Sequence, residues 1–255
     1  MAALHDSSLN RRIFLAGLMS LAAAPRLYAD EARIGKLIAE SRSFPSLAKR
    51  IDVISAALLG RRYHANTLIG GPRVKEQFVV RDDAFDCVTY VEVVLAAARA
   101  RDLPSFEAEL RAIRYRNGAV DWRERNHDFE AWYERNIANE IGHALVVGST
   151  VEVKKSIRSP AELGQRKYSI VATPRTVLLA HKDQLADGDV MGFVSLRPAL
   201  DYYHCSFVIR RENGEILLRH ASLSHGRVVN ERLETFVTAN RVRYVTLFRP
   251  QDKAA

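Results

Sequence analysis

The sequence has few cysteines, no long apolar run and no internal repeat. Two cysteines among 255 residues exclude a scaffold built from disulfides, so each cysteine needs its own explanation. The uncharged run near the N-terminus, residues 13–24, has 12 residues, whereas a transmembrane helix needs about 20. Low-complexity tracts and linkers rich in Pro or Gly are also missing after residue 29. We therefore expect residues 30–255 to form a single domain.

The charge is mildly positive, with 38 Lys and Arg against 30 Asp and Glu, and 47% of the residues are apolar. This composition argues against a disordered chain. Residues 1–29 hold three arginines and one aspartate, so the rest carries 35 basic and 29 acidic groups, a net charge of +6. Such a surface suits acidic partners without naming one. The basic residues are dispersed among acidic ones, so we expect no nucleic-acid binding.

The N-terminal segment has the pattern of an export signal. Arg11 and Arg12 precede the uncharged run, and Leu27–Ala29 then offers small residues for cleavage. The arginine pair resembles the twin-arginine signal, which implies export of an already folded chain. We expect a signal peptide over residues 1–29 and a periplasmic or secreted protein without a stable membrane anchor. The alternative is a short, buried N-terminal helix.

Helical and strand patterns occupy different halves of the chain. Apolar spacings of three and four residues predict helices over residues 34–39, 45–59, 87–100, 103–115 and 129–138. Short β-branched or aromatic runs predict strands over residues 146–153, 168–172, 189–194, 204–209, 216–220 and 243–248. Thr173-Pro174 has the pattern of an N-cap followed by proline and predicts a helix to about Leu185. This order favours an α+β fold with N-terminal helices packed on a mostly antiparallel sheet.

Cys87 falls in the first turn of the helix predicted over residues 87–100, and Asp86 is its predicted N-cap. Unpaired N–H groups and the positive end of the helix dipole favour an anion there, so the pKa of the thiol should be lowered. Asp86 opposes this effect by its charge, so the sulfur needs a positive partner. The alternative is that Cys87 is a small buried apolar residue.

Two histidines, His204 and His220, lie on either side of a predicted hairpin turn. A two-residue loop, Asn213–Gly214, would place them on opposite faces of the strand pair. A three-residue loop over Glu212–Gly214, ending in a glycine with positive φ, would pair Ser206 with His220 and bring both imidazoles to one face. We predict the three-residue loop.

The same alternation turns Cys205 away from His204. A disulfide between Cys205 and Cys87 is therefore expected to be disfavoured, and Cys87 is expected to remain free in an oxidising compartment. His143 and His225 are expected to be structural or exposed residues.

Three segments together resemble the catalytic blocks of the NlpC-type papain-like cell-wall hydrolases. They are F-D-C-V-T-Y-V-E (Phe85 to Glu92), L-D-Y-Y-H-C-S-F-V (Leu200 to Val208) and L-R-H-A-S (Leu218 to Ser222). The variant F-D-C-x-T-x-V-E is similar to the N-acetylmuramoyl-L-alanine amidase-like branch. Four further segments resemble that branch: Leu58–Tyr63, Ala112–Gly118, Arg125–Trp132 and Leu185–Val190. The resemblance covers most of residues 50–230 and implies a papain-like fold.

The sequence departs from the family pattern at three places. Cys205 and Ser206 stand where Val and Gly are usual after the first histidine. Asp128 stands where the branch usually has Tyr, and Arg61–Arg62 replaces a smaller, apolar pair. These differences concern the substrate pocket more than the catalytic set.

The resemblance implies a thiol amidase without cofactor or metal. Cys87 would attack the amide carbonyl, His204 would move the proton, and His220 would orient His204. Substrate or oxyanion contacts are implied for five residues: Tyr63, Asp86, Arg125, His127 and Trp132. For Arg125, His127 and Trp132, a capping or core role is the alternative.

The implied partners are peptidoglycan fragments, and the implied bond is the amide between N-acetylmuramic acid and L-Ala. One alternative is an endopeptidase of the same fold that cuts the stem peptide, and another is an inactive cell-wall-binding module. A third is a zinc site at Cys87, His204 and His220. Only three ligands are visible for it, and no H-E-x-x-H or C-x-x-C spacing supports it.

Overall fold

Most long helices precede most of the long strands, as predicted, but short strands between residues 62 and 85 were not predicted. The computed structural model describes residues 30–252, and the predicted export signal lies outside this range. The α-helices are α1 (Glu31–Ser41), α2 (Leu47–Ala57), α3 (Cys87–Arg99), α4 (Leu103–Arg114), α5 (Phe129–Ala138), α6 (Arg175–Ala180) and α7 (Leu233–Ala239). Short 3-10 turns are η1 (Arg116–Gly118), η2 (Trp122–Glu124), η3 (Ala161–Leu163) and η4 (Lys182–Gln184).

The strands form one large sheet and one small hairpin. They are β1 (Arg62–Tyr63), β2 (Ile69–Gly71), β3 (Val74–Gln77), β4 (Ala84–Phe85), β5 (Gly142–Leu145), β6 (Val151–Ile157), β7 (Arg166–Pro174), β8 (Val190–Val194), β9 (Tyr202–Arg210), β10 (Ile216–Ser222), β11 (Arg227–Arg232) and β12 (Tyr244–Pro250). The large sheet has the order β4-β1-β11-β10-β9-β8-β12-β7-β6, with β5 also paired to β12, and β2 pairs with β3. Apart from β1 and β4, the pairs are antiparallel, which confirms the predicted α+β class.

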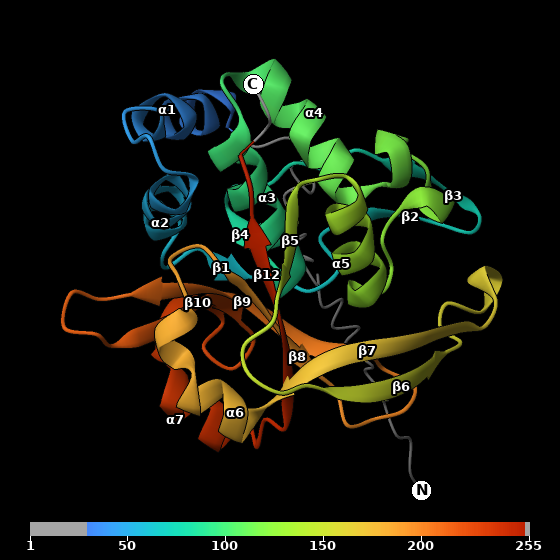
Figure 1. Ribbon diagram of the computed structural model, residues 1–255. Coiled ribbons are helices and arrows are strands. Elements are labelled where there is room, and N and C mark those ends of the chain that lie inside the picture. Colours follow the sequence, from blue (N-terminus) through green and yellow to red (C-terminus); the bar gives the residue numbers. More distant parts are fainter. Residues whose placement is uncertain (1–29, 253–255) are drawn as a thin grey trace, which may run out of the picture.

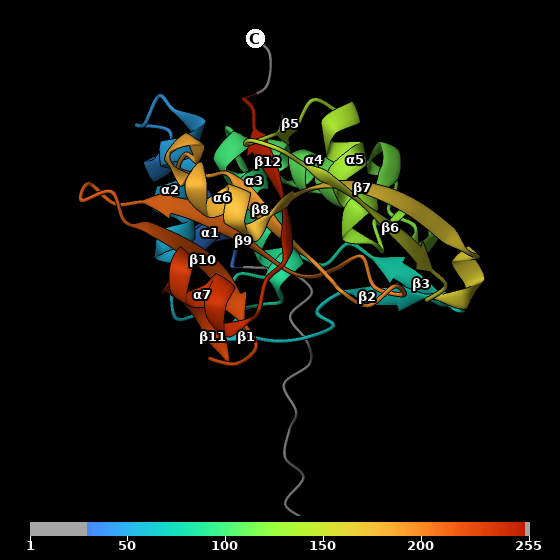
Figure 2. The same cartoon turned by 60° about the horizontal axis from the view of Figure 1, so that its bottom comes forward.

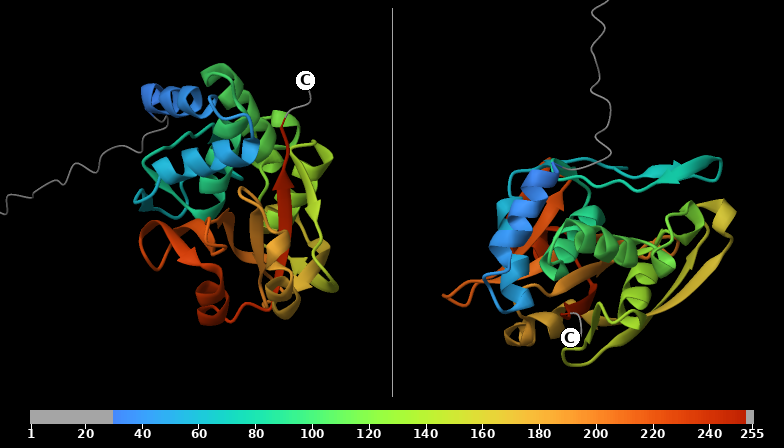
Figure 3. Two further views of the ribbon diagram at one scale, coloured as in Figure 1. Left: turned by 60° about the vertical axis from the view of Figure 1, so that its left-hand side comes forward. Right: turned by 90° about the horizontal axis from the view of Figure 1, so that it is seen from above.

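Helices cover both faces of the central strands (Figure 1). Helices α1 to α5 lie on one side, where apolar residues of α3 pack against those of β9 and β10. Helices α6 and α7 lie on the other side over a second apolar cluster. The β2–β3 and β6–β7 hairpins extend toward the same side of the molecule, as Figures 2 and 3 show from other directions. Helix α3 thus contacts α2 and α4 of the helical layer as well as β9 and β10 of the sheet.

Two predicted elements differ from the structure in their extent. The strand predicted over residues 146–153 begins only at Val151, because Gly148 adopts a φ of +63° in a turn after β5. The helix predicted from Thr173 to Leu185 is shorter and lacks the predicted cap. Thr173 pairs with Val245 in the sheet, so its backbone belongs to β7 and α6 starts only at Arg175.

Candidate active site

Cys87 is the first residue of α3, where the predicted cap is present. The Asp86 carboxylate accepts the N–H groups of Val88 at 3.0 Å and Thr89 at 2.8 Å, and the Thr89 hydroxyl accepts the Asp86 N–H at 3.0 Å. The rest of α3 is buried almost completely, so it fixes the position of its first turn. The structure therefore places a half-buried thiol at a rigid helix start, where backbone N–H groups favour an anion.

The hairpin between β9 and β10 has the predicted three-residue loop. Arg219 pairs with Phe207, and this register aligns His220 with Ser206. The last loop residue is a glycine with a φ of +82°. The prediction that His204 and His220 share one face is thus confirmed.

A hydrogen-bonded chain of side chains starts at Cys87. The His204 side chain acts on the Cys87 thiol, because its hydrogen-bonding capacity and its charge lower the pKa of Cys87. On its other side, His204 Nε2 lies 2.7 Å from His220 Nδ1, and His220 Nε2 lies 2.8 Å from Glu231 Oε2. Glu231 belongs to β11, a strand that the sequence patterns did not predict, so this fourth member was missed.

The carboxylate of Glu231 determines how protons are arranged along this chain. A carboxylate only accepts hydrogen bonds, so His220 Nε2 carries the proton and its Nδ1 accepts from His204 Nε2–H. Burial, followed by the charges of His204 and His225, lowers the pKa of His220 to about 3, which keeps His220 neutral. His204 is left with Nδ1 as the ring nitrogen that is not engaged with His220.

Cys205 lies next to Cys87, although the two cysteines are not bonded to each other. Its side chain does face away from His204, as predicted, and it is only 1% exposed. However, α3 packs on exactly this face of β9, and the Cys205 thiol donates to the Cys87 carbonyl at 3.3 Å. Both cysteines are free thiols, but the argument that separated them fails, because it placed Cys87 over the histidine face of β9 alone.

These neighbours perturb the acidity of the site. Hydrogen bonding from the Cys205 thiol, and then hydrogen bonding and charge from His204, lower the pKa of Cys87 well below its ordinary value. Burial and the nearby Cys87 charge raise the pKa of Asp86 to about 6. Burial, with Cys87 and Asp86, also raises the pKa of Tyr63, whose phenol therefore stays protonated, and Tyr63 is not part of the lining of the groove beside Cys87. The positive partner that the thiolate required is His204.

A groove of about 410 Å³ opens beside Cys87. Three residues predicted to contact substrate line it together with Cys87: Asp86, Arg125 and His127. Trp132 does not, because it is 1% exposed and stacks on Phe129 at 5.0 Å between ring centres. For Trp132, the structure therefore supports the alternative of a core role.

Arg125 and His127 are held in place by neighbours that the sequence did not reveal. Arg125 Nη1 lies 3.0 Å from a carboxylate oxygen of Glu76, which also accepts the Tyr115 hydroxyl at 2.9 Å. His127 Nε2 lies 2.6 Å from the Trp122 carbonyl oxygen, and burial lowers the pKa of His127. The groove thus has a fixed cationic group on one wall and a neutral imidazole next to it.

Asp128, which replaces the usual Tyr of the branch, connects α5 to the sheet. Its carboxylate accepts the Tyr168 hydroxyl at 2.8 Å and pairs with Arg166, both on β7. Asp128 is 6% exposed and is not part of the groove lining. This departure from the family pattern therefore changes a helix–sheet contact next to the groove.

The remaining predicted histidines lie outside the hydrogen-bonded chain. His143 is exposed on β5. His225 is 46% exposed in its side chain, and its Nδ1 lies 3.0 Å from the Ser222 hydroxyl and 3.8 Å from Glu231 Oε2. Both fit the expected exposed or structural roles.

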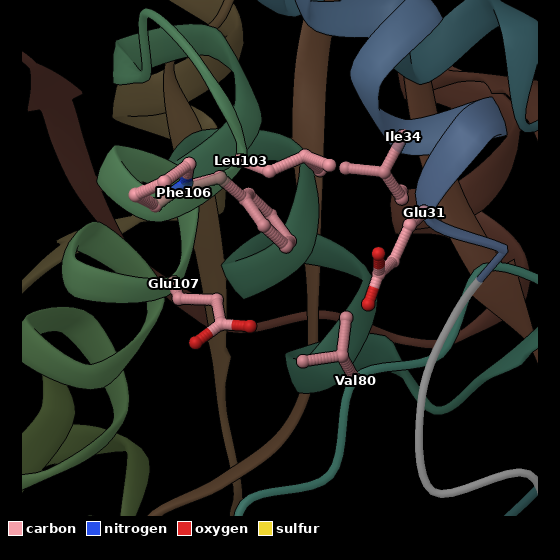
Figure 4. A pocket seen from close by; sticks show the side chains of 7 residues that line it. Glu31, Ile34, Val80, Leu103, Phe106 and Glu107 are labelled. Carbon is pink, nitrogen blue, oxygen red and sulfur yellow. The ribbon is translucent and has the colours of Figure 1, made fainter.

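A second hollow, between α1 and α4, has a different chemical character (Figure 4). The side chains of Ile34, Leu103 and Phe106 face it, and Glu31 and Glu107 lie at its edge. It has a volume of about 230 Å³ and is lined by neither a nucleophile nor an imidazole. It therefore does not compete with the Cys87 groove as a site of acyl transfer.

Within residues 30–252, no three His, Cys, Asp or Glu side chains are arranged so that they would hold a metal ion. In the same range, every helix is too short or too polar to span a bilayer.

Comparison with known proteins decides the family. A family model described as N-acetylmuramoyl-L-alanine amidase-like (AmiA-like) matches residues 53–243. The chain belongs to this family. Cys87, His204, His220 and Glu231 all lie inside the matched range of this amidase-like chain. Among curated proteins, none matches the sequence.

Solved structures share the fold of this amidase-like chain. A protein from Legionella pneumophila has a TM-score of 0.78 and 24% identity over 88% of this chain and 96% of that chain. An N-acetylmuramoyl-L-alanine amidase from Bacteroides uniformis has a TM-score of 0.68 and 23% identity over 78% of this chain and 97% of that chain. A further structure with the same description and organism gives 0.67 and 21%, over 86% and 100%. At these identities the likeness is one of fold.

Proposed function

We propose that this amidase-like chain is a cysteine amidase that hydrolyses the bond between N-acetylmuramic acid and L-Ala in peptidoglycan. The observation that carries the proposal is the hydrogen-bonded chain from Cys87 through His204 and His220 to Glu231, beside an open groove. Family membership supports a cell-wall substrate, and the Bacteroides uniformis neighbours support this particular bond. The fold is proposed to be of the papain-like NlpC type.

The chemistry follows from the arrangement of protons. The Cys87 thiolate attacks the lactyl carbonyl carbon of the muramoyl group, while His204 is an imidazolium that has taken the thiol proton. His204 Nδ1–H then protonates the L-Ala nitrogen, and the stem peptide leaves as an amine. Water, deprotonated by His204, hydrolyses the muramoyl thioester and regenerates Cys87. His220 holds the imidazolium of His204 through the lone pair of its Nδ1.

The backbone at the start of α3 stabilises the oxyanion in this proposal. The Cys87 N–H belongs to the first helical turn, where N–H groups have no partner within the helix and can bind developing negative charge. Tyr63 is a protonated phenol whose pKa responds to the charge of Cys87, and it is the proposed second donor. Arg125, on the wall of the groove, is proposed to bind a carboxylate of the stem peptide.

The proposed compartment is the periplasm or the cell exterior, reached through a twin-arginine signal over residues 1–29. The pattern of Arg11, Arg12 and the uncharged run supports this proposal. Expression of the full chain with and without the arginine pair replaced by lysines, followed by cell fractionation, tests it.

The bond that is cut can be identified from the products. Purified protein is incubated with defined muropeptides, and the products are analysed by mass spectrometry. The proposal expects an intact stem peptide with a free L-Ala amine together with a sugar fragment that ends in the lactyl carboxylate. Shortened stem peptides would instead indicate an endopeptidase. Binding to cell walls without any product would favour a binding module.

Thiol and metal reagents should have opposite effects on activity. Iodoacetamide is expected to abolish hydrolysis because the lowered pKa of Cys87 provides a reactive thiolate at the groove. Chelation with EDTA is expected to leave the rate unchanged. Inactivation by EDTA that added zinc reverses, together with resistance to iodoacetamide, would contradict the thiol mechanism.

Glu231 is expected to act as a positioning residue. Glu231→Ala removes the carboxylate that fixes the tautomer of His220. Loss of a hydrogen bond to a charged group lowers a rate by about 10- to 100-fold if the bond is needed in the transition state. We expect kcat to fall by about that factor with little change in KM, and the pH profile to shift. Glu231→Gln, which can still accept the bond, should restore part of the rate.

The control for Glu231→Ala is Glu234→Gln on α7. The Glu234 carboxylate pairs with Lys182 and is not part of the hydrogen-bonded set that includes His204 and His220. The kcat of Glu234→Gln should equal that of the unmodified protein. Equal rates for Glu231→Ala and Glu234→Gln would remove Glu231 from the mechanism.

A further inference from the structure

The two cysteines of the sequence lie against each other, although 118 positions separate them. The Cys205 thiol donates to the Cys87 carbonyl at 3.3 Å, and its proximity lowers the pKa of Cys87. Cys205 is fixed on β9, whose partner opposite it is Gly192 on β8. The contact is therefore made between two rigid elements, a helix start and a central strand.

The two sulfurs differ in how solvent reaches them. Cys87 is half-buried and lines the groove, whereas Cys205 is only 1% exposed beneath it. A small oxidant that enters the groove meets Cys87 first. Peroxides react with thiolates, and the lowered pKa of Cys87 makes this thiol the reactive one. Burial raises the pKa of Cys205, which therefore remains a protonated thiol next to Cys87.

We propose that Cys87 and Cys205 form a reversible disulfide that switches off the nucleophile under oxidising conditions. Cys205 is the resolving thiol, and a peroxide of the hydrogen peroxide class is the oxidant. Loss of activity on oxidation rests on the proposed role of Cys87 as the nucleophile. The disulfide itself rests only on the contact between the two cysteines. The Cys205 sulfur already lies 3.3 Å from the Cys87 carbonyl oxygen, so the two side chains start from neighbouring positions.

The reaction has two balanced steps. In the first, the Cys87 thiolate attacks one peroxide oxygen, the O–O bond breaks, and the protonated leaving group departs as water, so that Cys87 becomes a sulfenic acid. In the second, the Cys205 sulfur attacks the Cys87 sulfur, the S–O bond breaks, and the hydroxyl leaves as water with the Cys205 proton. Two electrons pass from the two thiols to one peroxide. A dithiol such as dithiothreitol returns them by thiol–disulfide exchange.

The resolving step also protects the enzyme. A sulfenic acid without a neighbouring thiol is oxidised further to sulfinic and sulfonic acids, which reductants do not restore. Cys205 stands where the family pattern usually has Val. A valine would not react with the sulfenic acid of Cys87, whereas the Cys205 thiol converts it to a disulfide.

The test compares unmodified protein with Cys205→Val, which fills the same space and matches the usual residue at this position. Both are treated with the same several-fold molar excess of hydrogen peroxide, and free thiols are counted in denaturant. Non-reducing tryptic digests are then examined by mass spectrometry. The unmodified protein should lose both thiols and yield a cross-linked pair of peptides, one with Cys87 and one with Cys205. Cys205→Val should yield sulfinic or sulfonic acid at Cys87.

Activity, relative to the untreated value of each variant, should return after dithiothreitol only when Cys205 is present. Cys87→Ala supplies the second control, because its Cys205 should stay reduced at the same peroxide dose. Sulfinic acid at Cys87 without a cross-link in the unmodified protein would overturn the proposal. The thiol count and the cross-link need no substrate, so failure of the amidase proposal and failure of the disulfide proposal are separate results.

Discussion

Cys87→Ala is expected to reduce the release of stem peptides from muropeptides by about 10⁴-fold or more, because loss of a catalytic nucleophile leaves only binding and oxyanion stabilisation. The same change should alter the free energy of unfolding by less than about 1 kcal/mol, since Cys87 is only half-buried and its helix is capped by Asp86 and Thr89. Product release measured by mass spectrometry and a thermal melt of the same sample check both parts.

The matched comparison is Cys205→Val, which alters the other thiol of the pair and leaves the nucleophile in place. Its activity should far exceed that of Cys87→Ala, even if loss of the hydrogen bond to Cys87 slows the reaction. Release by Cys87→Ala at the rate of the unmodified protein would show that the nucleophile lies elsewhere. Loss of the cooperative melt would instead assign Cys87 a structural role.

Arg114→Met is expected to cause the largest loss of stability. The Arg114 side chain is 2% exposed and its Nε lies 2.7 Å from Glu92 Oε2, while Glu92 is 3% exposed. Removing one member of a buried ion pair leaves an uncompensated charge, which costs about 3–5 kcal/mol. Urea unfolding followed by circular dichroism measures the change in the free energy of unfolding.

The loss of stability in Arg114→Met should depend on pH in a definite direction. Burial already raises the pKa of Glu92 above its ordinary value of 4.5, and loss of Arg114 should raise it further. The folded state then binds the Glu92 proton more tightly than the unfolded state, so stability falls as the pH rises from 4.5 through the folded-state pKa. Arg114→Met should therefore be more destabilising at neutral pH than in mild acid.

Two further variants isolate the buried charge. Arg114→Met combined with Glu92→Met should regain much of the lost stability, because both charges are then absent. Lys36→Met breaks an exposed pair with Glu40, 3.7 Å long, and should cost less than about 1 kcal/mol. Equal losses in Lys36→Met and Arg114→Met would contradict the assignment of a buried ion-pair effect.

Local patterns in the sequence predict the helices and the hairpin well. Helix α5 has the predicted bounds, Phe129–Ala138, because its apolar spacing and the polar residue before it are local properties. The β9–β10 register follows from alternation and from one glycine with positive φ. Both predictions depend on residues near one another in the chain, and this is why they succeed.

The errors arise where distant segments meet. Strand β11 was missed because R-V-V-N-E-R is mostly polar, and only its pairing with β10 makes it a strand. Glu231 was missed with it, although Gly226 before the strand, with a φ of +64°, was a turn signal that a hairpin search could have used. Cys205 was placed away from Cys87 because alternation along β9 does not tell which face α3 covers.

The position of β12 in the sheet determines when the fold can be completed during synthesis. Although β12 is the final described strand, it lies inside the sheet and joins β8 to β7 and β5. A nascent chain that ends before residue 244 would expose two unpaired strand edges, which are sites of misassociation. The two halves of the sheet can therefore close only after residues 244–250 have left the ribosome.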